Sequence, residues 1–519
     1  MRKLCPFFLS VFCYLPLSSQ NAGDSLFGSS LVHDIRITFP QTGYWDSLTT
    51  NYNASLNSDV DIYLPGNVTI DGNPLDSVGV RLKGNASYSH PGMKKSMKLS
   101  FDQYHSSQRY DGLKSIHLDN SAFDPSMLRE KLMLDILHHH GILAPRCTFA
   151  AVYVNGGYVG LYKIIETIDK TFLKTNFTYN DGNLFKGDPN GTLQWKGPQE
   201  SSYYSDYELK TNNTQNNWSD LVDLTDRINN SGGYFPQQMQ SRFDIDEYLW
   251  TLAANNLFVN LDSYMANPHN YYLYDDSLDG KFHWISWDVG LSFGVFPLWF
   301  QSQTVALDIF YLPKQPDKVP LNVHLFEYPE FRQTYMNAFC TYLNDDFNAR
   351  TLFPKIDSLA DRIRSYVYAE PDSNRMYTTA QFEGNLGYTS VSVWVISKIP
   401  GLKSFINQRG SDVGTQLCQY GWTCSSGYTA TKFSDPAIRI FPNPSSDQVT
   451  VYFEAPDPAK PVHYCIYDML GNRIFDKTEF LESGRYERTL DFTTKPSGVY
   501  VMKVESSCNE IEQKIVVVH

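Results

Sequence analysis

The residues with the clearest chemical potential gather around one short hairpin near the middle of the chain. In residues 269–294, HNYYLYDDSLDGKFHWISWDVGLSFG, Asn270 precedes an apolar strand, a polar turn reverses the chain, and Asp288 follows the return strand. Asp262 lies in the loop before this hairpin. In phosphoryl transfer, one Asp orients the acceptor hydroxyl while an Asn and a second Asp hold the metal on the phosphates. The three residues therefore predict Asp262 as a base beside a metal site made by Asn270 and Asp288, and Mg²⁺ prefers such oxygen ligands.

A helix and two strands must position these groups. Leu249, Leu252, Ala253 and Leu257 recur on one face of the preceding helix, which ends in NLDSYMANPHN and leaves Asp262 in a loop. The strands YYLY and FHWIS flank the turn DDSLDG. Protein kinases place their base, Asn and metal-binding Asp in this same order.

A second candidate region contains a lysine-bearing pair of strands. Residues 78–101, VGVRLKGNASYSHPGMKKSMKLSF, predict a strand, a glycine-containing turn and a second strand. Gly84 allows the backbone to approach a ligand closely, and exposed turn amides suit phosphate. Lys98 alternates with its apolar neighbours, so it projects from one face of the return strand. A solvated strand residue remains the alternative interpretation of Lys98.

The next helix is predicted to begin near Asp124, with Pro125 in its first turn, and to end at Gly141. Glu130 lies off its apolar stripe, on a flank that can face the lysine-bearing strand. The tract His138–His140 falls in the last turn, where cationic side chains need no metal, so no metal site is expected there.

The segment FAAVYVNGGYVGLYKIIETIDKTFL predicts a hairpin on Asn155-Gly156 that runs into Glu166 and another helix. A strand that ends in a short polar segment before a helix is a place where a nucleotide base can dock. Glu166 also fits the role of an acidic residue at a helix N-terminus, and both interpretations stay open.

Composition excludes some classes of partner. The chain has 519 residues, a formal net charge of −13 and 42% hydrophobic residues, with 35 Tyr and 32 Phe. This length allows two or three domains. The negative charge argues against a nucleic-acid-binding surface and against binding to an anionic membrane.

The N-terminus, MRKLCPFFLSVFCYLPLSSQ, resembles a secretory signal peptide over residues 1–20. Arg2 and Lys3 precede an apolar run, and cleavage is expected near Ser19–Gln20. Lipid attachment at Cys13 is disfavoured because bulky Phe12 precedes it. No later window approaches 18 consecutive apolar residues, so we expect no transmembrane segment after cleavage.

Six of the eight cysteines lie after the signal peptide, an even number that suits disulfides in an exported chain. Cys418–Cys424 is the expected local bridge, and Cys465–Cys508 is expected to link strands of one C-terminal domain. A zinc site is the rival interpretation, but no CxxC pair or matching His spacing supports it.

Composition also divides the chain. Residues 30–420 mix strands and helices, and within them residues 196–242 are rich in Asn, Gln and Ser and are predicted to be an insertion or loop. A turn-rich linker is expected over residues 421–436. Short alternating strands then predict a small all-β sandwich over residues 437–519.

The stretches FPNPSSDQVTVYF, YDMLGNRIF, PSGVYVMKV and QKIVVV resemble, in this order, the type IX secretion sorting domain of Bacteroidetes. The resemblance implies that residues 437–519 are an export address read by the type IX secretion machinery. The chain is then expected outside the cell or on its surface. An ordinary binding module of the same fold is the alternative.

The motifs RLKGNAS, KKSMKLSF, GYVGLYKIIETID, HNYYLY and WDVGLSFG resemble, in this order, the CotH family of atypical secreted protein kinases. The resemblance covers roughly residues 35–415. It implies an α+β fold with a two-lobed, kinase-like domain ahead of the β-sandwich, and the use of ATP with Mg²⁺ or Mn²⁺.

The resemblance also assigns roles residue by residue. Asp262 matches the catalytic Asp, Asp288 the metal-binding Asp, and Asn270 the second metal ligand, with Asn267 as the fallback. The expected nucleotide-binding residues are Arg81, Lys83, Gly84, Asn85 and Ser87 in the phosphate-facing loop, Lys98 as the nucleotide lysine, Glu130 as the partner of Lys98 inferred from topology, and Glu166 near the base.

Two departures from the family pattern stand out. The loop reads Asn85-Ala86-Ser87 where the family often has consecutive hydroxyl residues. Gly290 stands where many members carry a second acidic residue, which bears on how many metals bind.

The sequence thus predicts an exported kinase that transfers the γ-phosphoryl of ATP to Ser or Thr hydroxyls of secreted or surface proteins. The main alternative is a non-catalytic adhesion or glycan-binding protein on a degenerate kinase-like scaffold. A glycoside hydrolase using Asp262 and Asp288 is a third interpretation, but it leaves the lysine strand and the glycine loop without a purpose.

Overall fold

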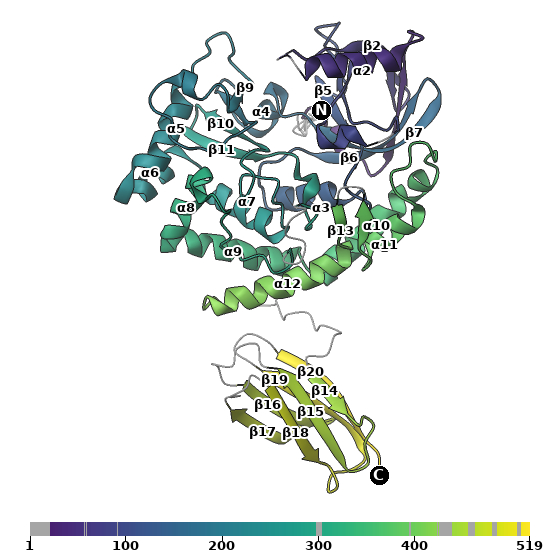
Figure 1. The fold of residues 1–519 in the computed structure, drawn as a ribbon, viewed down its shortest axis with the longest axis vertical. Coiled ribbons are helices and arrows are strands. Elements are labelled where there is room, and N and C mark those ends of the chain that lie inside the picture. The colour runs from purple at the N-terminus through teal and green to yellow at the C-terminus, as the bar shows by residue number, and fades with distance from the viewer. Residues whose placement is uncertain are drawn as a thin grey trace, which may run out of the picture.

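The computed structural model describes residues 21–519 apart from 57, 59, 91, 297–303, 394–395, 423, 425–437, 455–461, 480–484 and 506–509. The predicted signal peptide, residues 1–20, lies outside the described residues, as does most of the predicted linker, residues 421–436. The described chain mixes helices and strands and ends in a small all-β region (Figure 1).

A closed barrel forms the N-terminal part. Its strands follow the order β1-β2-β3-β4-β5-β7-β6, and β1 pairs in parallel with β6 to close it. Their bounds are β1 Val32–Thr38, β2 Leu64–Ile70, β3 Asn73–Leu82, β4 Met97–Ser100, β5 Ser115–Asp119, β6 Cys147–Val154 and β7 Gly157–Glu166. Apolar side chains fill one barrel core, among them Ile35, Ile70, Val80, Leu99 and Ile164. Helix α1 (Asp24–Phe27) contacts β6, and α2 (Tyr44–Ser55) lies against β2 and β3.

The local turn chemistry explains the hairpins of this barrel. Asn155 and Gly156 both adopt positive φ, 46° and 84°, between β6 and β7. A two-residue turn with this conformation matches the twist of its flanking strands, and Asn-Gly favours it. The strands expected within residues 78–101 are β3 and β4, with Arg81 opposite Lys98.

A second sheet has the order β11-β10-β8-β9. Its strands are β8 Leu184–Gly187, β9 Tyr207–Leu209, β10 Tyr271–Asp276 and β11 Lys281–Ser286. The predicted hairpin on DDSLDG joins β10 to β11, with Tyr271 opposite Ser286. Asn270 and Trp287 therefore flank the open end of the hairpin.

The helices after the barrel divide between the two sheets, since α6 and α7 contact β11 and α10 contacts β7 of the barrel (Figure 1). Their bounds are α4 Lys170–Asn176, α5 Ser219–Asn230, α6 Phe235–Arg242, α7 Ile245–Leu257, α8 Pro320–Glu327, α9 Pro329–Asp345, α10 Ala349–Tyr368, α11 Thr379–Leu386 and α12 Leu402–Gln419. The short strands β12 Val391–Val393 and β13 Ile396–Ile399 precede α12. The predicted helix with the stripe Leu249, Leu252, Ala253 and Leu257 is α7, and all four side chains are buried.

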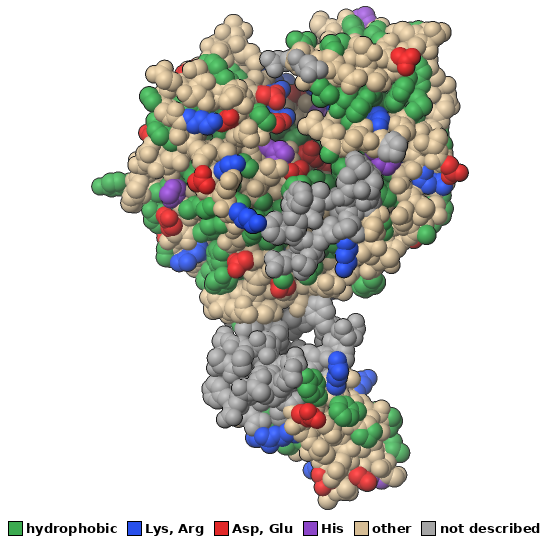
Figure 2. Space-filling view, viewed as in Figure 1, with side chains coloured by type: hydrophobic (Ala, Val, Ile, Leu, Met, Phe, Trp, Pro, Cys, Tyr) green, Lys and Arg blue, Asp and Glu red, His purple; other side chains and the backbone are tan. Residues whose placement is uncertain are grey.

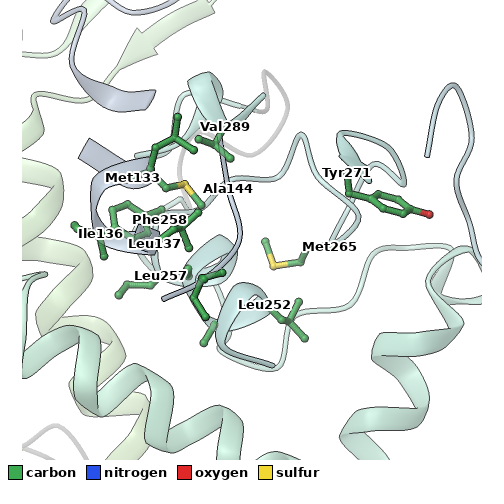
Figure 3. Close-up of a cluster of buried hydrophobic side chains, with 14 of the residues drawn as sticks. Met133, Ile136, Leu137, Ala144, Leu252, Leu257, Phe258, Met265, Tyr271 and Val289 are labelled. Carbon is green, nitrogen blue, oxygen red and sulfur yellow. The ribbon is translucent and has the colours of Figure 1, made fainter. Parts of the chain in front are cut away.

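Helix α3 (Arg129–His139) connects the barrel to the helices. Its Met133, Ile136 and Leu137 belong to the same buried cluster as Leu257 and Phe258 at the end of α7 (Figure 3). Val289, one residue after Asp288, lies in this cluster too. Burial of this apolar surface therefore fixes the N-terminal turn of α3 relative to the end of the β10–β11 hairpin.

The start of α3 corrects one expectation. Asp124 lies five residues before the first helical residue, Arg129, and accepts the Arg129 backbone N–H at 2.8 Å. Arg129 is fully buried, and its guanidinium donates to Asp124 Oδ1. Residues 124–128 thus form a buried turn ahead of the helix. In this turn Asp124 accepts hydrogen bonds from the backbone and the guanidinium of the buried Arg129.

Residues 196–242 are folded and do not form the loop that was one of the two predictions for them. They contain β9, α5 and α6, and Trp218, Leu221, Leu224, Phe235 and Met239 all belong to the main buried cluster. The apolar residues of α5 are spaced on one helical face, and the surrounding Asn and Ser residues obscured that period.

The C-terminal region consists of two sheets, ordered β14-β15-β18 and β17-β16-β19-β20. The strands are β14 Ile438–Phe441, β15 Gln448–Glu454, β16 Val462–Asp468, β17 Arg473–Glu479, β18 Arg485–Asp491, β19 Gly498–Glu505 and β20 Glu510–Val517. Val449, Val451, Tyr464, Ile466 and Met502 are among the residues of its own core. The small all-β region expected from the sequence is therefore present.

The disulfide pattern differs from the expectation. Cys424 pairs with Cys340 on α9, so the predicted bridge from Cys418 to Cys424 is wrong. Cys465 is a buried free thiol, and its expected partner Cys508 lies outside the described residues. Sequence proximity favoured the short loop, whereas the fold brings α9 to the end of α12.

Among the described helices, none is long and apolar enough to cross a membrane.

Candidate active site

The structure brings Asp262, Asn270 and their neighbours into direct contact. Asn270 Nδ2 donates to the Asp262 backbone oxygen at 2.8 Å and reaches Asp262 Oδ2 at 3.3 Å. Asn267 Nδ2 donates to Asp262 Oδ1 at 2.9 Å, and His269 Nε2 lies 2.8 Å from the same oxygen. The loop thus holds the Asp262 carboxylate in one orientation. Both the expected ligand Asn270 and the fallback Asn267 touch it.

Asp288 joins this group at the open end of the hairpin, the end at which Asn270 lies. The Trp287 N–H donates to the Asn270 oxygen at 3.2 Å, which closes the hairpin just before Asp288. Asp288 has a φ of 51°, in the left-handed region, and this conformation directs the chain into the short 3₁₀ turn Val289–Leu291. The three predicted residues therefore converge at one place.

The Asp288 carboxylate is exposed to solvent but lies in a recess with protein on several sides. This crowding raises its pKa, and Asp119 and Asp262 add to the rise while Lys83 opposes it. Asp288 thus lies close to the other acidic side chains Asp119 and Asp262, an arrangement that a bound cation stabilises.

A buried cluster of three charges faces Asp288. Lys163 on β7 contacts Glu130 on α3 at 2.6 Å and Asp119 at the end of β5 at 3.0 Å. Burial lowers the pKa of Lys163, but Asp119 and Glu130 outweigh burial and raise it well above its ordinary value. Burial raises the pKa of Glu130 to about 7, despite the opposing effect of Lys163. One ammonium stays protonated between two carboxylates, and the cluster is anionic whenever both carboxylates are ionised.

Gly290 shows how closely this cluster approaches the hairpin. A Cβ placed on Gly290 would lie 3.7 Å from Glu130 Oε2, 3.8 Å from Lys163 Nζ and 3.9 Å from Asp288 Oδ1. The carboxylate of Glu130 therefore lies close to the place that an acidic side chain at position 290 would occupy. The departure from the family pattern at Gly290 leaves an acid close to this part of the site.

Lys83 lies between the barrel and the hairpin. Its Nζ is 3.4 Å from His117 Nδ1 and 5.7 Å from the centre of the Trp287 ring. Burial lowers the pKa of Lys83, while the charges of Asp119, Asp288 and Glu130 oppose that change. Burial and the nearby lysines lower the pKa of His117 well below its ordinary value, so the neutral ring can accept a hydrogen bond from Lys83.

Together these groups line a hollow between the barrel and the helical part. Figure 2 shows that this face is hollowed there, and that acidic and histidine side chains gather in it. Strands β3, β5 and β7 supply the barrel side, α3 supplies Glu130, and the β10–β11 hairpin supplies Asp288. The hollow is thus lined by acids, lysines and an amide, a set suited to a cation and an anion held side by side.

The loop expected to face phosphate follows β3. Gly84 has a φ of +99°, and a Cβ there would lie 2.2 Å from Ser87 Oγ, so only glycine fits. The Tyr52 hydroxyl donates to the Gly84 oxygen at 2.6 Å and ties the loop to α2. Asn85 is exposed and Ser87 is half-buried. The loop follows β3, and Lys83 is the first residue after that strand.

Lys98 occupies a neighbouring but different position from that of Lys163. It lies opposite Arg81 on β3 and His117 on β5. Burial and the charge of Arg81 lower its pKa to about 8. Arg81 itself pairs with Asp61 at 2.9 Å. The ion-pair partner of Glu130 is Lys163, so the predicted pairing of Glu130 with Lys98 is wrong.

Glu166 forms an ion pair with Arg146 and is not open to a ligand. It is buried, and Arg146 contacts Glu166 Oε1 at 2.6 Å and Oε2 at 2.9 Å. Successive residues of a strand alternate between its faces, so Glu166 projects from the face of β7 opposite to that of Lys163. A direct contact between Glu166 and a nucleotide base is therefore not supported by this geometry.

His269 makes the stability of this site depend on pH. Burial lowers the pKa of His269, but the hydrogen bond and the charge of Asp262 outweigh burial and raise it. A raised folded-state pKa means that protonated His269 stabilises the fold below the unfolded pKa near 6.5, and that this contribution is lost as the pH rises through the folded-state pKa. We expect His269→Gln to lower the melting temperature most at pH 5.5 and least at pH 9, measured by differential scanning calorimetry. A difference that is constant across this range would contradict the ion pair.

Sequence reasoning missed Lys163, Asp119, His117 and His269. Lys163 carried one usable signal, because it is the single charged residue in the apolar run YVGLYKII of β7. A lysine inside a buried strand requires a partner. Which carboxylates serve it depends on the pairing of β5 with β7 and on the docking of α3, which no short motif encodes.

Comparison with known proteins adds an independent finding. The family described as CotH kinase protein matches residues 80–412, and the family described as secretion system C-terminal sorting domain matches residues 439–518. The inner spore coat protein H of Bacillus subtilis (strain 168) is 30% identical over 284 residues, which cover 54% of this chain and 75% of that protein. The invasin CotH3 of Rhizopus delemar is 24% identical over 289 residues, which cover 51% of this chain and 47% of that protein. The sorting domain directs the chain through type IX secretion to the cell surface or the exterior.

Proposed function

Because the chain belongs to the CotH kinase protein family, whose match spans residues 80–412, we propose that it is an exported kinase. The reaction proposed is transfer of the γ-phosphoryl of ATP to Ser or Thr hydroxyls of secreted or surface proteins. The observation that carries the proposal is the convergence of Asp262, Asn270 and Asp288 opposite the buried pair Lys163–Glu130. In this proposal the barrel and the helical part serve as the two lobes of a kinase-like domain.

The residues present fit a divalent cation. Asp288 is an exposed carboxylate whose pKa is raised by desolvation in its recess and by other acids, and Asn270, which carries an amide oxygen, lies at the same end of the hairpin. In the proposal these two residues hold Mg²⁺ or Mn²⁺, which would neutralise negative charge on the phosphates of ATP. Because its Nδ2 donates to Asp262, the amide of Asn270 is fixed in orientation.

Asp262 is proposed as the base that accepts the proton of the acceptor hydroxyl. Asn267 and His269 both contact its Oδ1, whereas Oδ2 makes the longer contact of 3.3 Å to Asn270 Nδ2, so Oδ2 is proposed to face the acceptor. His269 acts as a positioning residue, because its Nε2 lies 2.8 Å from Asp262 Oδ1 and holds that oxygen in place. A base held in one orientation does not have to be ordered at the moment of transfer.

Lys163 and Lys83 are proposed to provide the positive charge on the phosphate side. The pair Lys163–Glu130 has the composition of the ion pair between a strand lysine and a helix glutamate that protein kinases require. Lys83 stands between this pair and the hairpin, and the glycine loop after β3 follows it directly. Lys98, Arg81, Asn85 and Ser87 remain candidates for contacts at the outer part of the same cleft.

The test is transfer of labelled phosphate from ATP to a protein acceptor by the purified mature chain, with Mg²⁺ or Mn²⁺. The wild type is expected to transfer phosphate, and ATP at 100 times its Kd is expected to stabilise the fold by about 2.7 kcal/mol only when the metal is present. Asp288→Asn should lose both effects. Asp279→Asn, in the exposed hairpin turn, is the matched control and should retain both. Absence of both binding and transfer in the wild type would refute the proposal.

A second candidate function is a non-catalytic adhesion or glycan-binding protein on a degenerate kinase-like scaffold. The observation in its favour is that some relatives are invasins by name. Binding to a glycan array, together with a melting temperature that ATP and Mg²⁺ leave unchanged, would favour this candidate over the kinase.

A further inference from the structure

A second cluster of metal-binding side chains lies at the opposite end of α3 from Glu130. His139 and His140 end this helix, and Asp346 follows the last residue of α9. His139 Nδ1 lies 3.1 Å from both oxygens of Asp346, and His140 Nε2 lies 2.6 Å from Asp346 Oδ2. One ligand atom from each residue lies within 4.8 Å of the other two.

We propose that His139, His140 and Asp346 form a Zn²⁺ site. Imidazole nitrogens suit zinc, and two His with one carboxylate is a known set of three protein ligands. Ligand atoms about 2.0–2.1 Å from a tetrahedral zinc are about 3.3 Å apart. His139 Nδ1 lies 3.1 Å from both Asp346 oxygens, close to that value, whereas the 2.6 Å between His140 Nε2 and Asp346 Oδ2 is a direct hydrogen bond that has to lengthen when zinc binds. The site is distinct from the candidate active site, where the donors are oxygens.

The surroundings of the three ligands support this assignment. The His140 ring packs edge-on against Tyr342, with ring centres 4.8 Å apart, and it also contacts Trp250. These contacts fix the orientation of one imidazole before any metal binds. The side chain of His139 is 61% exposed, so water can reach the metal and complete its coordination.

The same lone pairs carry protons when no metal is bound. Both ring nitrogens face Asp346, and burial of that carboxylate is outweighed by hydrogen bonds from the two imidazoles, so the pKa of Asp346 is lowered. When Zn²⁺ binds, it takes the lone pairs of His139 Nδ1 and His140 Nε2. The proton on such a nitrogen moves to the other nitrogen of a neutral ring, and an imidazolium ring releases one proton to solvent. The expectation from the sequence that the His tract needs no metal did not include Asp346, which lies 206 residues later in the chain.

Zinc binding at this site would hold α3 in place against α9. Zinc would join the C-terminal end of α3 to the C-terminal end of α9, while the N-terminal turn of α3 carries Glu130 into the candidate active site. Cys340 on α9 is also joined to Cys424 by a disulfide. The zinc site would thus stabilise the packing of α3 against α9.

The test is zinc binding by the mature chain carrying Asp288→Asn, which removes the proposed metal ligand of the active site. After dialysis against a chelator, this protein is titrated with Zn²⁺ in a calorimeter and with Co²⁺ in a spectrophotometer. We expect one tightly bound Zn²⁺ per chain, a tetrahedral Co²⁺ spectrum and proton release on binding.

Three further substitutions in that background decide the location. His139→Gln, at an exposed position, and Asp346→Asn should each weaken zinc binding at least about 100-fold. Removing a metal ligand lowers the affinity more than removing a residue that only contacts a ligand, which lowers it about 10–100-fold. His283→Gln is the matched control, since His283 belongs to other His–carboxylate groups. Zinc binding that survives His139→Gln and Asp346→Asn, or that disappears with His283→Gln alone, would overturn the proposal, as would no binding at all. None of these three outcomes bears on phosphate transfer, which is measured with Mg²⁺ and an intact Asp288.

Discussion

Replacing Asp262 with Asn is expected to lower kcat for phosphate transfer by about 10²–10⁴-fold, the contribution typical of a general base. Asn has nearly the same shape and can still interact with Asn267 and His269, so the loop should keep its structure. It cannot accept the proton of the acceptor hydroxyl. Because Asp262 lies on the acceptor side of the site, the affinity for ATP with Mg²⁺ should stay close to that of the wild type.

The measurement is the initial rate at varied ATP and varied acceptor concentration, together with the stabilisation of the fold by ATP and Mg²⁺. Asp279→Asn again serves as control, because it also removes one carboxylate but lies in the hairpin turn. A variant at position 262 that retains the wild-type kcat would exclude Asp262 as the base. Loss of ATP binding in this variant would instead place Asp262 among the metal ligands.

The second large effect is expected for Lys163→Met. The ammonium lies 2.6 Å from Glu130 and 3.0 Å from Asp119, and its side chain is only 2% exposed. Removing it leaves two carboxylates without their shared partner, and loss of one member of a buried ion pair costs about 3–5 kcal/mol of folding free energy. Phosphate transfer should be lost as well, because the phosphate side loses its buried cation.

A double variant separates the two effects. In Lys163→Met/Glu130→Gln the uncompensated carboxylate of Glu130 is also gone, so a large part of the lost stability should return in urea unfolding. Phosphate transfer should stay absent, because stability is restored without the cation. Recovery of transfer in the double variant would show that Lys163 acts only in folding. Single variants that are as stable as the wild type would contradict the buried cluster itself.

The parts of the fold that follow from local chemistry were predictable. Asn155-Gly156 and the turn DDSLDG each joined two strands as expected, and the apolar stripe of α7 indicated its buried face. The order of Asp262, Asn270 and Asp288 along the chain was sufficient to expect them together, because one helix end and one hairpin position all three.

Partners that lie far apart in the chain were not predictable. Glu130 was expected to face a lysine on β4, but the register of β5 with β7 places Lys163 beside Asp119, and α3 docks over that pair. Glu166 was assigned to a ligand because its partner Arg146, a half-buried residue just before β6, belongs to no recognisable motif. The bridge from Cys340 to Cys424 spans 84 residues, and only the packing of α9 near α12 explains it.

The most direct test of the central claim is a crystal structure of the mature chain with Mn²⁺ and a non-hydrolysable ATP analogue, using anomalous scattering to locate the metal. The claim is that Asp288 and Asn270 bind a cation beside Asp262, across the cleft from Lys163 and Lys83. The predicted result is a manganese peak next to the Asp288 carboxylate and the Asn270 amide oxygen, with the phosphates directed toward those two lysines. A nucleotide bound elsewhere, or a metal peak remote from Asp288, would contradict it.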